Sequence, residues 1–154
     1  MTHYTTNEIL RSLRYALNVN EKKLIHILEL AEYIATEEEL LAYLLPEGSV
    51  GYEACPDVVL SRFLDGLIAF KRGKREGADF RGYSDDSPIT NNIVLKKIRI
   101  AFELKDSDLI TLIEKSGLLK ISKTELTAFF RRPDHRNFRI CGDQYLRNVL
   151  KGLG

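Results

Sequence analysis

The stretch TTNEILRSLRYAL at residues 5–17 decides the fold, because a related stretch, TNNIVLKKIRIAF, follows at residues 90–102. Each stretch begins with a Thr suited to helix capping and continues with apolar residues at the spacing of one helix face. With a shift of 85 positions the stretches share these identities: Thr5 with Thr90, Asn7 with Asn92, Leu10 with Leu95, Arg14 with Arg99 and Ala16 with Ala101. A match that keeps both the cap and the apolar register indicates an internal duplication.

The match continues toward the C-terminus once the shift becomes 86. It then pairs Glu39 with Glu125, Leu40 with Leu126, Ala42 with Ala128, Cys55 with Cys141, Asp57 with Asp143, Leu60 with Leu146 and Leu64 with Leu150. Each copy contains four apolar helical patterns, separated by turn formers. We therefore predict an all-α protein made of two tandem copies of a small four-helix unit.

The predicted units are residues 5–73 and residues 90–153, joined by a linker at residues 74–89 that is rich in turn formers and charge. The sequence allows either two packed copies or two flexibly tethered ones. A unit of roughly 65 residues buries only a thin core on its own. We favour copies packed with pseudo-two-fold symmetry, because the helices carry more large apolar residues than one such unit can hide.

Composition and charge argue against several broad classes of protein. The formal net charge of +1 argues against a polybasic or polyacidic chain. Two cysteines are too few for a disulfide scaffold and fit a reducing cytosol. The polar segment 1–7 has no signal-peptide pattern, and no apolar run approaches the ~20 residues of a membrane-spanning helix. We expect a cytoplasmic protein with no membrane partner.

The sequence predicts no catalytic residue, no metal site and no cofactor. The histidines His3, His26 and His135 share no spacing with one another. No HExxH segment, Ser-His-Asp order or Walker-type glycine loop is present. An enzyme would need a site assembled from residues of both copies, so we expect the protein not to be an enzyme.

The matched Cys-x-Asp segments, Cys55 to Asp57 and Cys141 to Asp143, allow two interpretations. A helix N-terminus can lower the pKa of a thiol, which makes each cysteine a candidate reactive thiol or metal ligand. A nucleophile needs a base, however, and only Cys141 has a histidine nearby, His135. We favour the structural interpretation, in which the aspartates cap the last helix of each unit and the cysteines are small buried residues.

Arg14 and Arg99 occupy the same position in both copies, one helical turn beyond a matched leucine. This retention within one chain argues for a shared role. One candidate role is structural, as an ion pair or a carbonyl contact across the interface between the copies. The other is contact with a ligand, and we favour the structural role.

The charge is divided unevenly between the copies. Residues 1–76 hold 9 Lys and Arg against 12 Asp and Glu, whereas residues 92–154 hold 13 against 7. The positive charge of the second copy concentrates in one predicted loop, at Arg131, Arg132, His135, Arg136 and Arg139. Lys71 and Arg72 add a second basic spot at the end of the first copy.

Aromatic residues interleave with the basic loop, at Phe129, Phe130 and Phe138. Arginines among aromatic rings can hold phosphates and stack on bases. For the loop taken by itself we favour the structural interpretation, a solvated basic loop whose Phe side chains face inward. The equivalent loop of the first copy, residues 45–54, is acidic to neutral, so a nucleic-acid ligand would not meet two equivalent copies.

Four segments carry a resemblance to a known family. TNNIVLKKIRIAFEL at residues 90–104 and CGDQYLRN at residues 141–148 resemble the YehS-like family of duplicated bacterial proteins. LRSLRY at residues 10–15 and FLDGLI at residues 63–68 are similar to the same family. The resemblance covers the chain apart from the linker and implies a bacterial, cytoplasmic protein. The family is a domain of unknown function, so the resemblance implies no activity, cofactor or site residue.

Two functions of different classes fit these observations. The first is a non-enzymatic nucleic-acid-binding protein that uses the basic loop, together with a helix-turn-helix-like pair of helices in each unit. The second is a protein-interaction adaptor in which the paired units form a groove for a partner. We favour the first, because the charge asymmetry is the feature that distinguishes the copies.

Overall fold

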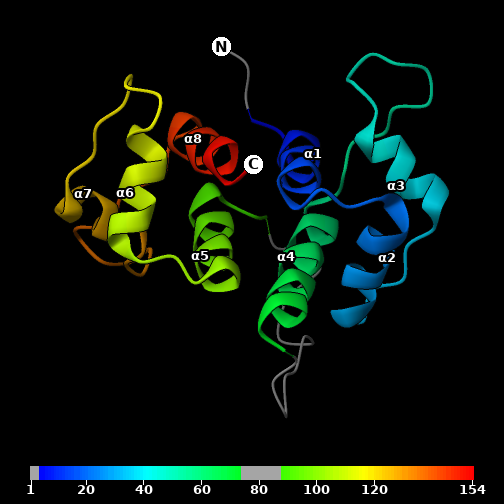
Figure 1. Ribbon diagram of the computed structural model, residues 1–154, viewed down its shortest axis with the longest axis horizontal. Helices are drawn as coiled ribbons and strands as arrows, with labels where there is room; N and C mark the ends of the chain where they lie inside the picture. The colour runs from blue at the N-terminus through cyan, green and yellow to red at the C-terminus, as the bar shows by residue number, and fades with distance from the viewer. Residues whose placement is uncertain (1–3, 74–87) are drawn as a thin grey trace.

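The computed structural model describes residues 4–73 and 88–154, and all regular structure in these ranges is helical (Figure 1). The helices of these ranges are α1 Thr6–Leu17, α2 Glu21–Leu30, α3 Glu37–Leu44, α4 Asp57–Arg72, α5 Asn91–Phe102, α6 Asp106–Glu114, α7 Lys123–Phe129 and α8 Asp143–Leu153. The prediction of an all-α protein with four helices in each repeat is confirmed. Within the described residues, no helix is both long and apolar enough to cross a membrane. The predicted linker lies outside the described residues, apart from residues 88 and 89.

Matching residues produce matching helix ends in the two repeats. Thr5 and Thr90 each accept a hydrogen bond from the third backbone N–H of the helix that follows. Both helices are 12 residues long, and they end at Asn18 and Glu103, which are left-handed with a φ of 54°. The first helix of each repeat therefore begins and ends in the same way. Because the residue after each helix has the same φ, the chain leaves both helices with the same local backbone geometry.

The repeats pack against each other with pseudo-two-fold symmetry. Figure 1 shows α4 and α5 side by side in the middle of the molecule, with α1 and α8 next to each other above them. The first helix of each repeat thus packs on the last helix of the other repeat. Helices α2 and α3 cover one flank, and α6 and α7 cover the opposite flank.

One hydrophobic core joins the two repeats. Leu10 of α1, Leu64 of α4, Leu95 of α5 and Leu150 of α8 are all buried, and they belong to a single cluster of apolar side chains. Burying an apolar side chain of this size contributes about 2 kcal/mol relative to leaving it in water. The repeats are therefore packed rather than flexibly tethered.

Asp57 and Asp143 join the repeats instead of capping helices. Each is the first residue of its helix, and the preceding residues, Pro56 and Gly142, make no side-chain cap. The Asp57 carboxylate accepts a hydrogen bond from the backbone N–H of Ile89, at 3.0 Å. The Asp143 carboxylate accepts the equivalent bond from the N–H of Tyr4, also at 3.0 Å. The predicted capping role is wrong, because the chain entering the other repeat supplies the donor.

Asn7 and Asn92 hold the loop before the last helix in each repeat. The Asn7 amide donates to the carbonyls of Tyr43 and Glu53 and accepts from the N–H of Cys55. Asn92 makes the same three bonds at equivalent positions, to Phe129, Arg139 and Cys141. Both asparagines are buried, with exposed fractions of 2% and 9%. Sequence matching paired these residues but did not reveal this role.

Candidate functional site

The basic loop of the second repeat projects into solvent, and Asn92 holds the backbone on both sides of it by hydrogen bonds. Residues 131–137 are all exposed. The backbone turns back on itself, because the N–H of His135 donates to the carbonyl of Arg132 and the N–H of Phe138 donates to the carbonyl of His135. The N–H of Asn137 donates to the His135 ring. The loop therefore presents its arginines from an ordered turn.

A pocket of about 480 Å³ opens beside this loop, between it and α5. Its lining combines Lys96, Arg131 and Arg132 with apolar and aromatic side chains, and no carboxylate is among the described residues that line it. The remaining lining residues are Thr90, Asn92, Ile93, Phe129, Phe130, Pro133, Phe138 and Ile140. Ile140 is 80% exposed, so apolar surface faces solvent at a positively charged rim.

The ion pairs that the loop arginines make are long and solvent-exposed. Arg132 lies 3.5 Å from Asp134, and the Arg132 side chain is 87% exposed. Arg139 lies 3.6 Å from Glu125, also near the surface. Exposed ion pairs of this kind stabilise a protein little, so they compete weakly with an incoming anion. Arg131 lies 3.4 Å from the His135 ring, and Arg136 is exposed.

Lys71 and Arg72 lie apart from this loop, at the end of α4. The Lys71 ammonium sits 4.4 Å from the centre of the Phe102 ring. The Arg72 guanidinium donates to the carbonyl of Ile100 and lies 3.5 Å from Glu103. Both side chains therefore contact the C-terminal end of α5 and contribute to the packing of the repeats.

Arg14 and Arg99 make ion pairs inside their own repeats. Arg14 lies 2.6 Å from Glu21, and Arg99 lies 2.8 Å from Asp106, the equivalent position. Each pair ties the end of the first helix to the start of the second. Arg99 also stacks on the Phe130 ring, with 4.7 Å from the guanidinium carbon to the ring centre. It therefore supports an aromatic side chain that lines the pocket beside the basic loop.

The two cysteines are buried, and their thiols are expected to be unreactive. Cys55 is 4% exposed and Cys141 is 0% exposed. Burial is the main cause that raises the pKa of each thiol to about 12, and Asp57 and Asp143 raise it further. At neutral pH both thiols are protonated, and a protonated thiol is a poor nucleophile and a poor metal ligand.

No metal site stands out. Among residues 4–73 and 88–154, no three His, Cys, Asp or Glu side chains gather in a group that would hold an ion. His135 contacts the loop backbone and Arg131.

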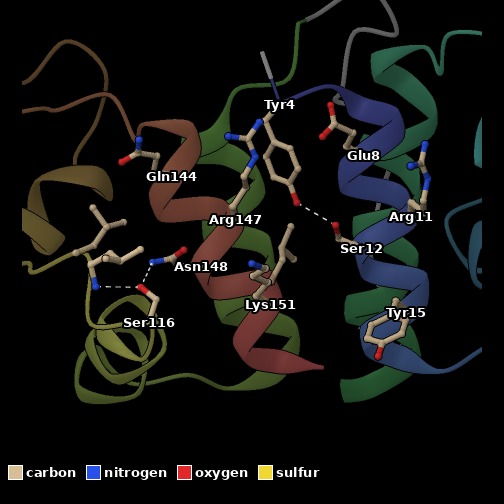
Figure 2. Close-up of a pocket in the computed structure, with 13 residues that line it drawn as sticks. Tyr4, Glu8, Arg11, Ser12, Tyr15, Ser116, Gln144, Arg147, Asn148 and Lys151 are labelled. Atoms are coloured by element: carbon tan, nitrogen blue, oxygen red, sulfur yellow. Dashed lines mark hydrogen bonds between the residues drawn. The ribbon is translucent and has the colours of Figure 1, made fainter. Parts of the chain in front are cut away.

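Sequence reasoning missed a second cavity, of about 730 Å³, between α1 and α8 (Figure 2). Both repeats contribute to it, since Ser12 and Tyr15 come from α1 while Arg147 and Lys151 come from α8. No motif signals this cavity, because it depends on which helices meet across the repeat interface.

Comparison with known proteins gives a family but no activity. A family model described as "Protein of unknown function (DUF1456)" matches residues 6–73 and again residues 91–154. The protein named "Uncharacterized protein YehS" from Escherichia coli (strain K12) is 48% identical over 148 residues, which cover 96% of this chain and 93% of that protein. No solved structure matches the chain. The resemblance drawn from the sequence is confirmed, and both matched segments coincide closely with the helical repeats.

Proposed function

This chain belongs to the DUF1456 family of proteins of unknown function, and we propose that it binds single-stranded nucleic acid, without catalysis, at the basic loop of the second repeat. One observation carries the proposal: the pocket beside the loop combines three cationic side chains with aromatic ones and no carboxylate. The two buried, unpaired cysteines fit a reducing compartment, and we infer that binding takes place in the cytoplasm.

The chemistry of the pocket suits a base with its flanking phosphates. Phe130 and Phe138 supply aromatic faces, on which any base can stack with a contribution of about 1–3 kcal/mol. The positive charge that phosphates need comes from three residues that line the same pocket, Arg131, Arg132 and Lys96. Stacking and charge depend little on base identity, so we expect weak sequence preference.

Single strands fit better than duplexes. An unpaired base can turn out of its strand and enter a recessed aromatic pocket, whereas a stacked base pair cannot. In a helix-turn-helix mode, the second helix of a tightly turned pair would enter the major groove. In the second repeat that helix is α6, which begins with Asp106 and presents an exposed Asp108. Its acidic start would meet the DNA phosphates, so the predicted helix-turn-helix contribution finds no support here.

The test is titration of a short fluorescent oligothymidylate, and of the same strand annealed to its complement, at several salt concentrations. We expect the single strand to bind more tightly, and its affinity to fall with salt at a logarithmic slope of about −2, which corresponds to ~0.7 for each of three phosphates. Replacing Arg131 and Arg132 by Ala is expected to weaken binding about tenfold. Phe138→Ala is expected to weaken binding by a similar factor while leaving the salt slope unchanged.

A matched control removes equal charge elsewhere. Lys22 and Lys23 are exposed on α2, on the flank opposite the basic loop (Figure 1). Replacing both by Ala should leave the affinity unchanged. The proposal fails if no binding is detected at low salt, or if the Arg131/Arg132 variant and the Lys22/Lys23 variant bind equally well.

A protein-interaction adaptor is the alternative from a different class. It predicts that the chain retains a defined protein partner after nuclease treatment, with that partner insensitive to changes at Arg131 and Arg132. Recovery of nucleic acid alone, lost on nuclease treatment, would favour the proposal made here.

A further inference from the structure

The two interfaces between the repeats are equivalent by pseudo-symmetry but are filled differently. In one interface α4 packs on α5, and in the other α8 packs on α1. The second interface holds the cavity of about 730 Å³. Three pairs of equivalent residues differ between the two interfaces.

In the α4–α5 interface a buried ion pair spans the two helices. The Lys97 ammonium lies 2.7 Å from the Asp65 carboxylate, and these side chains are 8% and 6% exposed. The same ammonium lies 3.4 Å from the Ser61 hydroxyl. The long lysine side chain fills the space, and the aspartate balances its charge.

At the equivalent positions the α1–α8 interface carries more positive charge and lacks the carboxylate. Ser12 stands where Lys97 stands in the other interface, Lys151 replaces Asp65, and Arg147 replaces Ser61. Figure 2 shows Arg147 and Lys151 on α8 across from Ser12 on α1. The position on α1 is therefore a small serine where α5 has a long lysine, and the charge of the matched position on α8 has changed from negative to positive.

The walls of this cavity also carry exposed apolar and aromatic surface. Tyr15 is 81% exposed and Leu118 is 89% exposed. The Arg147 guanidinium lies on the Tyr4 ring, 4.6 Å from its centre, while the Tyr4 hydroxyl lies 3.0 Å from Ser12 (Figure 2). These contacts hold Arg147 at the upper wall of the cavity. A volume of 730 Å³ is within the range of about 300–1,000 Å³ that is usual for small-molecule sites.

We propose that the α1–α8 cavity binds a small organic anion, with a carboxylate, sulfonate or phosphate group on a flat or branched apolar body. The anionic group lies between Arg147 and Lys151, which both line the cavity. The apolar body lies against Tyr15 and Leu118. Glu8 also lines the cavity, which favours one anionic group over the repeated phosphates of a nucleic-acid strand. The proposal is independent of the nucleic-acid site, since the two sites have no lining residue in common.

The experiment compares two fluorescent probes of the same shape. Anilinonaphthalene sulfonate has an anionic group on an aromatic body, and N-phenylnaphthylamine has the same body without the charge. We expect one equivalent of the anionic probe to bind, about tenfold more tightly than the neutral probe. Lys151→Ala should weaken the anionic probe about tenfold and barely change the neutral one.

A double variant rebuilds the closed interface. Ser12→Lys with Lys151→Asp reproduces the arrangement of Lys97 and Asp65 on the other side, so it should fill the cavity and abolish binding of both probes. Thermal unfolding followed by circular dichroism checks that the variants are folded, and the Arg131/Arg132 double alanine variant should bind both probes normally. The proposal is overturned if the neutral probe binds as tightly as the anionic one, or if Lys151→Ala and the double variant bind the anionic probe like the unchanged protein.

Discussion

The loop before α4 and the loop before α8 follow the same backbone path with different charge. Asn7 and Asn92 hold them by the same three hydrogen bonds. Inside them, the N–H of Ser49 donates to the carbonyl of Pro46 as the N–H of His135 donates to the carbonyl of Arg132. Backbone groups and one buried amide therefore form the part of this frame that the two loops share.

The exposed side chains of these loops are where the repeats diverge. The loop of the first repeat carries Glu47 and Glu53 and a fully exposed Val50, whereas that of the second repeat carries four arginines. A duplicated frame can thus retain its shape in both copies while one copy acquires a binding surface. The predictions that follow test where the repeats are equivalent and where they differ.

The largest expected effect concerns the buried Lys97–Asp65 ion pair of the α4–α5 interface. Lys97→Met leaves the Asp65 carboxylate buried without its cation, which should lower the free energy of unfolding by about 3–5 kcal/mol. Ser12→Ala, at the equivalent position, removes one hydrogen bond to Tyr4 and should cost about 1 kcal/mol. Urea denaturation measures both. Adding Asp65→Leu to Lys97→Met should restore most of the stability; if the single and double variants are equally unstable, the ion pair is not the cause.

The next effect should be equal in the two repeats. Asn7→Ala and Asn92→Ala each remove three hydrogen bonds and leave buried backbone groups unpaired, so each should lower the free energy of unfolding by about 3 kcal/mol. Chemical denaturation of the two variants gives the comparison. A loss of less than about 1 kcal/mol in only one of them would show that the frames are not energetically equivalent.

Gly66 and Gly152 occupy matched positions but should respond differently to alanine. A Cβ at Gly66 would meet the backbone carbonyl of Ile27, whereas one at Gly152 would meet the far end of the Leu112 side chain, at 2.5 Å. Backbone cannot give way as a side chain can, so Gly66→Ala should cost about 2 kcal/mol. Gly152→Ala should be close to neutral, since the ~1 kcal/mol gain in helix propensity offsets the rearrangement of Leu112. Thermal and urea unfolding measure both, and equal losses would contradict this contrast.

The smallest expected effect concerns the aspartates that join the repeats. Asp57→Ala removes the acceptor for the N–H of Ile89 and should cost about 1 kcal/mol. Asp143→Ala should cost somewhat more, because Asp143 also accepts from the Asn91 amide at 2.7 Å. Denaturation with urea is again the measurement, with Asp134→Ala in the exposed loop as a control of no expected effect. The interpretation is wrong if Asp57→Ala resembles that control.

The sequence predicted the fold well because local residues determine it. Helix caps such as Thr5 and Thr36 act within one turn, and the apolar register can be read directly along the chain. The match between Arg14 and Arg99 predicted a shared structural role, and both arginines do make equivalent ion pairs. Their partners proved to be local, within each repeat, rather than across the interface.

The candidate sites were predicted only in part, for two physical reasons. The basic loop was visible because its residues are consecutive, but the contribution of Lys96 from α5 to its pocket depends on tertiary packing. The α1–α8 cavity was not visible at all, since its lining residues, such as Ser12 and Lys151, are far apart in the sequence and meet only in the folded chain. Matching the repeats emphasises what is conserved between them, whereas this cavity arises at positions where they differ.

The reciprocal bonds from Asp57 to Ile89 and from Asp143 to Tyr4 have a consequence for synthesis on the ribosome. The first repeat emerges first, and the faces of α1 and α4 that later receive α8 and α5 are then uncovered. The second repeat supplies the helices that cover these faces, and it is part of the same chain, so it meets them at a higher effective concentration than a separate molecule would. The duplication thus provides each half of the protein with its partner during synthesis.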